Sequence, residues 1–83
     1  MNIVYEPHFE RSAAYDEDKL IGQCNYHDAI NSWTIVHTEV DPEYGGQGIA
    51  RKLVKCLIEE AEKKCIKLNS TCSYASKVLQ EQQ

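Results

Sequence analysis

Long apolar runs are missing from this 83-residue sequence, and so is any excess of positive charge. No stretch approaches the roughly 18 consecutive apolar residues that a membrane-spanning helix needs, so we expect no membrane segment. Nine Lys and Arg residues against 13 Asp and Glu residues give a net charge of −4. This balance argues against nucleic acid as the partner. The first residues carry neither the basic nor the apolar region of a secretory signal, which favours a cytoplasmic location.

The cysteines lack the spacing of a metal site. Cys24, Cys56, Cys65 and Cys72 form no Cys-x-x-Cys pair, and the gaps between them do not match a zinc framework. We therefore expect no metal and four reduced thiols. Cys56 and Cys65 are predicted to be small buried residues of a helix.

Alternating apolar and polar residues predict strands in the first half of the chain, at Ile3–Tyr5, Glu10–Tyr15, Lys19–Tyr26 and Ser32–Val40. Turns are predicted at Asp16–Asp18 and His27–Asn31. The last strand is the clearest, with Trp33, Ile35 and His37 predicted on one face and Thr34, Val36, Thr38 and Val40 on the other. Because both faces carry bulky or β-branched residues, we expect a central strand covered on both sides.

A helix is predicted from about Gly46 to about Lys64. Its apolar face is expected to hold Ile49, Ala50, Leu53, Val54, Leu57, Ala61 and Cys65. A short strand, Ile66–Leu68, and a final helix, roughly Tyr74–Gln80 with Ser73 as N-cap, follow. Strand, helix and strand in this order favour a right-handed crossover between parallel neighbours. The sequence thus predicts one α/β (α+β) domain with a mixed sheet of about four to five strands, one long helix and a short C-terminal helix.

Three glycines, Gly45, Gly46 and Gly48, lie where the best strand passes into the long helix. Glycine permits positive φ angles and leaves no Cβ in the way of a ligand. The first N–H groups of a helix lack partners and can bind a pyrophosphate, with Arg51 adding a charge-assisted bond. The alternative is a tight connection that simply needs glycine. A P-loop and a dinucleotide fingerprint are both excluded, because neither motif is completed.

The segment from His37 to Val54 resembles the acetyl-CoA motif of the GNAT acetyltransferase superfamily, Arg/Gln-x-x-Gly-x-Gly/Ala. That motif maps onto Gly45-Gly46-Gln47-Gly48-Ile49-Ala50. His37-Thr38 before it and Thr71-Cys72-Ser73-Tyr74 after it resemble the minimal single-domain GNAT-like subfamily. The resemblance covers roughly Lys19 to Leu79. It departs at Gly45, where the family usually has Arg or Gln.

The resemblance implies a GNAT-like fold that binds acetyl-CoA and transfers the acetyl group to an amine, either of a small molecule or of a protein lysine or N-terminus. It implies a thioester between the strand that ends at Val40 and the strand near Leu68, with the Val40 N–H as a donor to the carbonyl. The implied cofactor-binding residues are Thr38, Val40, Gly45, Gly46, Gln47, Gly48, Ile49, Ala50, Arg51, Ser73 and Tyr74.

Cys72 and His37 are the candidate catalytic residues. Cys72 precedes a predicted helix N-terminus, a location that lowers the pKa of a thiol and suits a nucleophile; the alternative is a small residue that lines the cofactor. His37 is a candidate base, or else a hydrogen-bonded sheet histidine. Glu39 is a second candidate base, or a solvated carboxylate at the end of a strand. Two other functions stay open: a non-catalytic acyl-CoA-binding module or sensor, and a small interaction domain.

Overall fold

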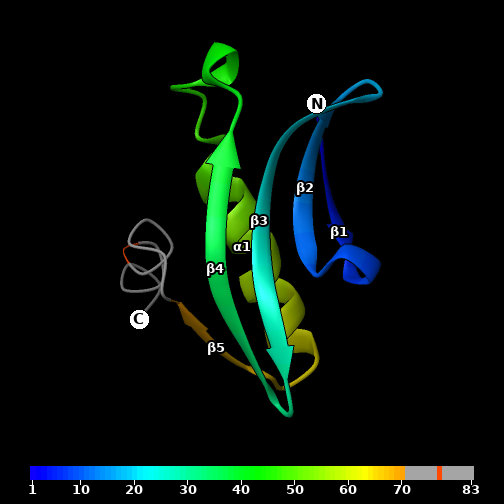
Figure 1. Cartoon of the computed structure of the whole chain (residues 1–83), viewed down its shortest axis with the longest axis vertical. Coiled ribbons are helices and arrows are strands. Elements are labelled where there is room, and N and C mark those ends of the chain that lie inside the picture. Colours follow the sequence, from blue (N-terminus) through cyan, green and yellow to red (C-terminus); the bar gives the residue numbers. More distant parts are fainter. Residues whose placement is uncertain (71–76, 78–83) are drawn as a thin grey trace.

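The computed structural model describes residues 1–70 and residue 77. Five strands form one sheet in the order β1-β2-β3-β4-β5, antiparallel except for the parallel pair β4–β5 (Figure 1). The elements are β1 (Asn2–Glu6), the 3-10 turn η1 (Pro7–Phe9), β2 (Arg11–Asp16), β3 (Lys19–Ala29), β4 (Ser32–Val40), the 3-10 turn η2 (Pro42–Tyr44), α1 (Ile49–Lys63) and β5 (Lys67–Ser70). The predicted mixed sheet with one long helix is confirmed. Apart from residue 77, the predicted helix Tyr74–Gln80 lies outside the described residues.

The predicted turn at His27–Asn31 is wrong. Strand β3 continues to Ala29, which pairs directly with Ser32, so only Ile30 and Asn31 form the loop. Asn31 has φ 60°, a left-handed conformation that asparagine tolerates better than most residues. Because the loop has only two residues, the β3–β4 pairing continues up to it, and His27 and Asp28 are strand residues.

A β-bulge in β4 changes which side chains share a face. Asn25 pairs with His37 and Tyr26 with Ile35, so Val36 is an extra residue without a counterpart in β3. Trp33 and Ile35 are buried against α1, whereas His37 is exposed. The prediction that His37 shares a face with Trp33 and Ile35 is therefore wrong. The physical reason is that a bulge breaks the two-residue alternation.

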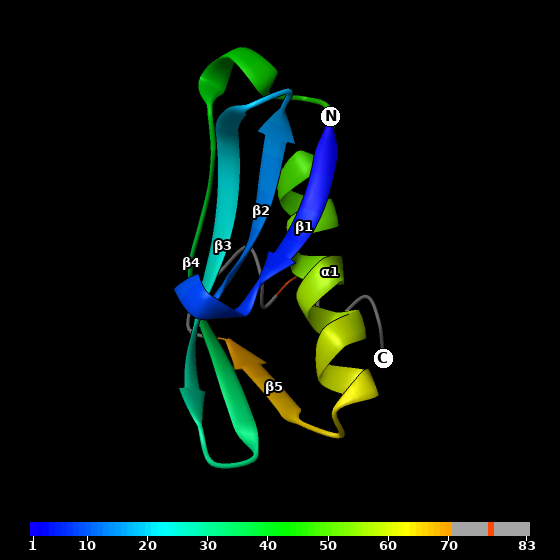
Figure 2. The same cartoon turned by 90° about the vertical axis from the view of Figure 1, so that its right-hand side faces the viewer.

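Beyond the bulge, Thr38 and Val40 turn toward the helix side, with the Thr38 Oγ1 3.4 Å from the buried Cys24 Sγ. His37 and Glu39 turn the other way. Figure 2 shows α1 on one side of the sheet. Within the described residues no second layer covers the opposite side, so the expectation that β4 is covered on both faces is wrong for this part of the chain. We call this uncovered side, with Glu6, Arg11, Tyr15, Gln23, His37 and Glu39, the open face.

The core lies between the sheet and α1. The helix buries Ile49, Leu53, Val54, Leu57 and Ala61 against sheet residues that include Cys24, Tyr26, Trp33 and Ile35. A buried hydrogen bond adds to this packing, because the Ser12 hydroxyl donates to the Leu53 carbonyl at 2.8 Å. No helix in the described part of the chain is long and apolar enough to span a membrane.

The helix is shorter than predicted at its start. It begins at Ile49 rather than Gly46, because Gly46 and Gly48 have φ angles of 80° and 73°, outside the helical region. At the other end Lys64 is the C-cap and Cys65 adopts φ 55° with an exposed side chain. The prediction that Cys65 is buried on the apolar face is therefore wrong, while Cys56 is half-buried.

Candidate functional site

The glycine-rich connection between β4 and α1 has a defined backbone. The Tyr44 N–H donates to the Asp41 carbonyl at 2.9 Å, and the Gly45 N–H donates to the Pro42 carbonyl at 3.1 Å. The Asp41 carboxylate caps this turn by accepting from the Glu43 N–H at 3.0 Å. The Gly45 donor is therefore already used, and the N–H groups that follow it are the ones to consider for a ligand.

The α-helical ladder begins at Lys52, whose N–H donates to the Gly48 carbonyl at 3.1 Å. The N–H groups of Gly48, Ile49 and Ala50 precede that first bond and have no acceptor within the helix. No acidic side chain lies in the first turn of α1, and Arg51 and Lys52 follow immediately. This end of the helix thus combines backbone donors, the positive end of the dipole and two cationic side chains, which is the chemistry of an anion site.

The glycines at this site are there for their backbone conformation. A Cβ at Gly46 or at Gly48 would meet nothing within 4 Å, so space does not demand glycine, but the positive φ at both positions does. Gly45 is different, with φ −61° in the extended region that any residue adopts. A Cβ there would lie 3.3 Å from the Pro42 carbonyl oxygen. Gly45 is consequently the one glycine of the three that a side chain can replace without backbone strain.

In the described part of the chain, the second half of β4 is an edge that runs from the β4–β5 pairing to this turn. The described pairing runs from Ser32–Lys67 to Ile35–Ser70 and goes no further. The second half of β4, which ends at Val40, extends past it, as Figure 1 shows. An acyl chain that follows this edge would meet backbone groups of β4, among them the N–H of Val40.

A chain of hydrogen bonds crosses the open face from β1 to β4. The His37 Nε2 lies 3.1 Å from the Glu39 Oε2, and the Gln23 amide donates to the Glu39 Oε1 at 2.8 Å. The Arg11 guanidinium donates to the Gln23 oxygen at 3.0 Å and to the Glu6 carboxylate at 2.7 Å. The Gln23 bond, and then the His37 bond, lower the pKa of Glu39. Glu39 is therefore ionised at neutral pH and suited to orient the His37 ring.

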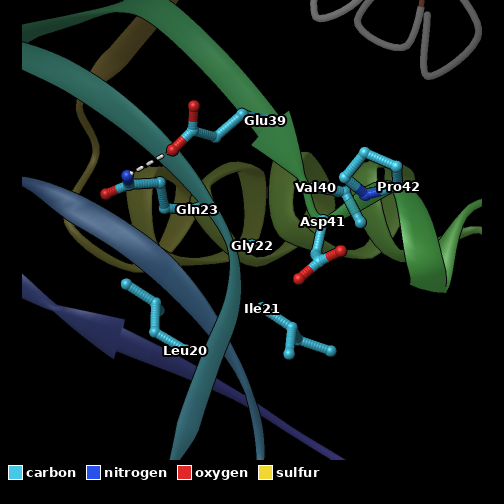
Figure 3. A pocket seen from close by; sticks show the side chains of 8 residues that line it. All are labelled: Leu20, Ile21, Gly22, Gln23, Glu39, Val40, Asp41 and Pro42. Atoms are coloured by element: carbon cyan, nitrogen blue, oxygen red, sulfur yellow. Dashed lines mark hydrogen bonds between the residues drawn. The ribbon is translucent and has the colours of Figure 1, made fainter.

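An open hollow of about 330 Å³ lies on the open face, beside the Gln23–Glu39 bond (Figure 3). Gly22 forms part of its wall, and a Cβ there would lie 3.1 Å from the Glu39 carbonyl oxygen. The full lining is Leu20, Ile21, Gly22, Gln23, Glu39, Val40, Asp41 and Pro42. The hollow therefore extends from Glu39, the partner of His37, to Pro42, where η2 begins.

Two cysteines of the described region can be compared as nucleophiles. Cys24 is fully buried in the core. Burial, and then the charges of Glu60 and Glu59, raise the pKa of the Cys56 thiol, which makes it less reactive at neutral pH. Cys72, Ser73 and Tyr74 lie outside the described residues.

The sequence singles out the glycine-rich turn, His37 and Val40 as candidates, and the structure gathers these near the end of β4. The sequence patterns miss Gln23 and Arg11, whose partners lie 16 and 12 residues away along the chain. They also miss the contact between Tyr44 and Asp16, whose polar side-chain atoms lie 2.6 Å apart. The strand register creates all these contacts, so a pattern within one strand cannot show them.

Comparisons with known proteins agree with this geometry. A family model described as GCN5-related N-acetyl-transferase matches residues 9–83. Among solved structures, a GCN5-like protein from Staphylococcus aureus is 29% identical with a TM-score of 0.73, over 98% of this chain and 79% of that one. The ribosomal-protein-S18-alanine N-acetyltransferase from Escherichia coli is 20% identical with a TM-score of 0.75, over 94% of this chain and 54% of that one.

The PaiA N-acetyltransferase from Thermoplasma acidophilum, solved in complex with coenzyme A, is 23% identical with a TM-score of 0.62, over 68% of this chain and 35% of that one. The likenesses to the PaiA enzyme and to the Escherichia coli enzyme concern the fold alone. This chain spans about a third of the length of the PaiA enzyme and about half of the length of the Escherichia coli enzyme. No curated protein is significantly similar to the chain in sequence. The family model, however, covers nearly the whole chain, including the glycine-rich turn. The chain therefore belongs to the GCN5-related N-acetyltransferases, a family of acyltransferases.

Proposed function

We propose that this domain binds acetyl-CoA at the start of α1 and transfers the acetyl group to a primary amine. The observation that carries the proposal is the helix start itself: backbone donors from Gly48 to Ala50 precede the first helical bond, with no acid in the first turn. A pyrophosphate is the part of coenzyme A that such a group of donors would bind. The PaiA enzyme, which has a similar fold, was solved in complex with coenzyme A, and this is consistent with the proposed ligand.

The cofactor site that we propose extends along both sides of the turn. Gly46, Gln47, Gly48, Ile49, Ala50 and Arg51 would hold the pyrophosphate, with Gly45 supporting the turn. The pantetheine arm would follow the β4 edge, with Thr38 beside it and the Val40 N–H donating to the thioester carbonyl. Ser73 and Tyr74 are proposed to line the same site.

Two routes to the amine use different residues. In the direct route His37, oriented by Glu39 at 3.1 Å, takes a proton from the attacking amine. The amine nitrogen forms the amide as the thioester C–S bond breaks, and coenzyme A leaves as its thiolate, which can take the proton from His37. In the covalent route the Cys72 thiolate attacks the thioester carbonyl and coenzyme A leaves as its thiolate. The amine then attacks the acetyl-Cys72 carbonyl, which forms the amide and restores the cysteine thiol.

A positively charged acceptor fits the charges near the hollow on the open face. Glu39 and Asp41 are both in its lining, and the protein is acidic overall. Amines of small molecules, of a lysine or of a protein N-terminus all share this chemistry. Among the structural neighbours, the aminoglycoside acetyltransferase in complex with sisomicin and the ribosomal-protein-S18-alanine N-acetyltransferase illustrate a small-molecule acceptor and a protein acceptor.

A non-catalytic acyl-CoA-binding module is the second candidate. It is favoured by Gly45, which gives the turn no side-chain clamp, and by the absence of a second layer over the open face of residues 1–70. Both candidates require coenzyme A binding, and only the first requires turnover.

Calorimetry with coenzyme A and with acetyl-CoA tests the binding. Saturable heat with both ligands is expected, and no heat with either would reject both candidates. Intact mass after incubation with acetyl-CoA tests the chemistry. An acetylated species that Cys72→Ser abolishes supports the covalent route, whereas amine acetylation unchanged in Cys72→Ser supports the direct route. Binding without acetylation of any amine in a broad panel supports the non-catalytic module.

A further inference from the structure

The β2–β3 hairpin holds the segment that leads into the glycine-rich turn. The Tyr44 hydroxyl donates to the Asp16 carboxylate at 2.6 Å. The Asp41 N–H donates to the Ile21 carbonyl at 2.7 Å, and the Lys19 ammonium lies 3.9 Å from the Asp41 carboxylate. All three partners on the hairpin side lie within or next to the turn between β2 and β3, which Figures 1 and 2 show at the same end of the sheet as η2.

The Tyr44–Asp16 bond is the shortest of these three contacts, and it is sheltered. Both residues are half-buried, and the Tyr44 ring packs against the core cluster. The hydrogen bond to Asp16 and, less strongly, burial raise the pKa of Tyr44 to about 12. The Tyr44 hydroxyl therefore keeps its proton at neutral pH and can donate it to Asp16.

The glycine-rich turn depends on what holds its two ends. Gly46 and Gly48 have no Cβ and no neighbour within 4 Å of where one would be, so side-chain packing does not constrain them. The helix end of the turn is held by the buried side chains of Ile49 and Leu53. The strand end is held by η2, and η2 is tied to the rest of the molecule through Tyr44. Without that tie, the Tyr44 end of η2 keeps its ring packing and the backbone bond at Asp41 but loses the side-chain hydrogen bond that fixes it to β2.

We propose that Tyr44 and Asp16 are positioning residues that hold the backbone donors of the glycine-rich turn in place for the pyrophosphate of coenzyme A. The proposal rests on the proposed function for the identity of the ligand. It assigns no contact with the ligand to either residue. Preorganised donors bind an anion more tightly than donors that must first be ordered, so the tie contributes to affinity from a distance.

The first experiment needs no ligand. Amide spectra of the free protein are compared between wild type, Tyr44→Phe and Asp16→Asn. We expect the Gly46 and Gly48 amide signals to shift or broaden in both variants. The other amide signals should stay as dispersed as in wild type, which shows that the variants are folded. The matched control is Tyr15→Phe, which removes a similar bond, 2.7 Å from the Tyr15 hydroxyl to the Glu6 carboxylate, without touching residues 41–48. Unchanged Gly46 and Gly48 signals in both variants would overturn the proposal.

The second experiment measures coenzyme A affinity by calorimetry, at a temperature where each variant is folded. Tyr44→Phe and Asp16→Ala are each expected to raise the Kd for coenzyme A by about fivefold. Each substitution removes one hydrogen bond to a charged group, and only part of that loss of free energy reaches the ligand site. The double variant should show no further loss, because both substitutions remove one bond. Asp16→Asn, which keeps an acceptor oxygen, should recover part of the affinity, and Tyr15→Phe should match wild type.

The outcomes separate this proposal from the proposed function. If wild type shows no heat with coenzyme A, the proposed function fails, while the glycine signals still report whether Tyr44 holds the turn. If wild type binds and Tyr44→Phe binds equally well, only the positioning role fails. A merely structural role would lower the melting temperature of the variants but leave the Kd of the folded protein unchanged, and that result also overturns the proposal.

Discussion

The His37 imidazole and the Glu39 carboxylate face each other at 3.1 Å on the open side of β4, two residues apart on the same strand. Both side chains are a little more than half exposed, 57% and 56%. The contact is possible because residues i and i+2 of a strand point to the same face. The Gln23 amide donates to the other carboxylate oxygen at 2.8 Å, which favours the orientation in which the carboxylate faces the ring.

A test of this pair is His37→Gln. Thiol release from acetyl-CoA is measured with the amine that gives wild type its highest rate. We expect the rate to fall roughly 100-fold, the contribution of a general base, with the Kd for coenzyme A unchanged. Glu39→Gln, which removes the charge but keeps a hydrogen-bonding group, should cost about tenfold. A His37→Gln rate equal to that of wild type would remove His37 from the mechanism.

Gly45→Arg should tighten coenzyme A binding. The position has φ −61° and ψ 152°, which arginine adopts without strain, and a new Cβ needs only a small adjustment at the Pro42 carbonyl, 3.3 Å away. A guanidinium beside the pyrophosphate adds a charge-assisted bond, for an expected gain of roughly three- to tenfold in affinity. Calorimetry measures the gain, and Gly45→Ala is the control for the backbone. If Gly45→Arg binds no better than Gly45→Ala, the pyrophosphate does not lie at this turn.

Ser12→Ala should lower the free energy of unfolding by about 1 kcal/mol. The Ser12 side chain is fully buried, and its hydroxyl supplies a sheet-to-helix bond at 2.8 Å to the Leu53 carbonyl. Urea denaturation followed by circular dichroism measures the change. Ser32→Ala, at a half-buried position beside the β3–β4 loop, should stay within about 0.5 kcal/mol of wild type. Equal losses in the two variants would argue against a specific role for the Ser12 bond.

Acid should weaken the fold partly through Glu6. The hydrogen bond from Tyr15 is the largest cause of the shift, and with Arg11 it lowers the pKa of Glu6 below 4.5 despite opposition from burial. A carboxyl whose pKa is lower in the folded state stabilises the fold above its unfolded pKa, and this contribution is lost as the pH falls through the folded value. As the pH falls below 4.5, the urea midpoint of wild type should therefore drop more than that of Glu6→Gln. Parallel acid profiles for the two proteins would contradict the assignment to Glu6.

The sequence was informative where a pattern is local and less so where it depends on register. The long helix and the succession of strands along the chain could be predicted because each element carries its own periodicity, as Leu53, Leu57 and Ala61 do in α1. The predicted helix start at Gly46 is wrong because residue types alone do not give the positive φ angles of Gly46 and Gly48. The orientation of His37 was misjudged because the bulge at Val36 arises between two strands.

The same distinction applies to the site. The glycine-rich turn is a contiguous motif and could be found by reading along the chain. Two supporting side chains come from strands earlier in the sequence: Gln23, which donates to Glu39, and Asp16, which accepts from Tyr44. Only the pairing of β2, β3 and β4 brings them within reach. Supporting contacts of this kind need the three-dimensional structure.

The extra residue at Val36 decides which face of the sheet each side chain in the second half of β4 occupies. Before it, the odd-numbered positions Trp33 and Ile35 belong to the core; after it, the odd-numbered positions His37 and Glu39 belong to the solvent side. In a regular ladder without the bulge, strict two-residue alternation over residues 33–40 would place His37 and Glu39 on the core side with Trp33 and Ile35, and Thr38 on the solvent side. The irregularity of the ladder at Val36 is therefore what keeps the imidazole and the carboxylate in water.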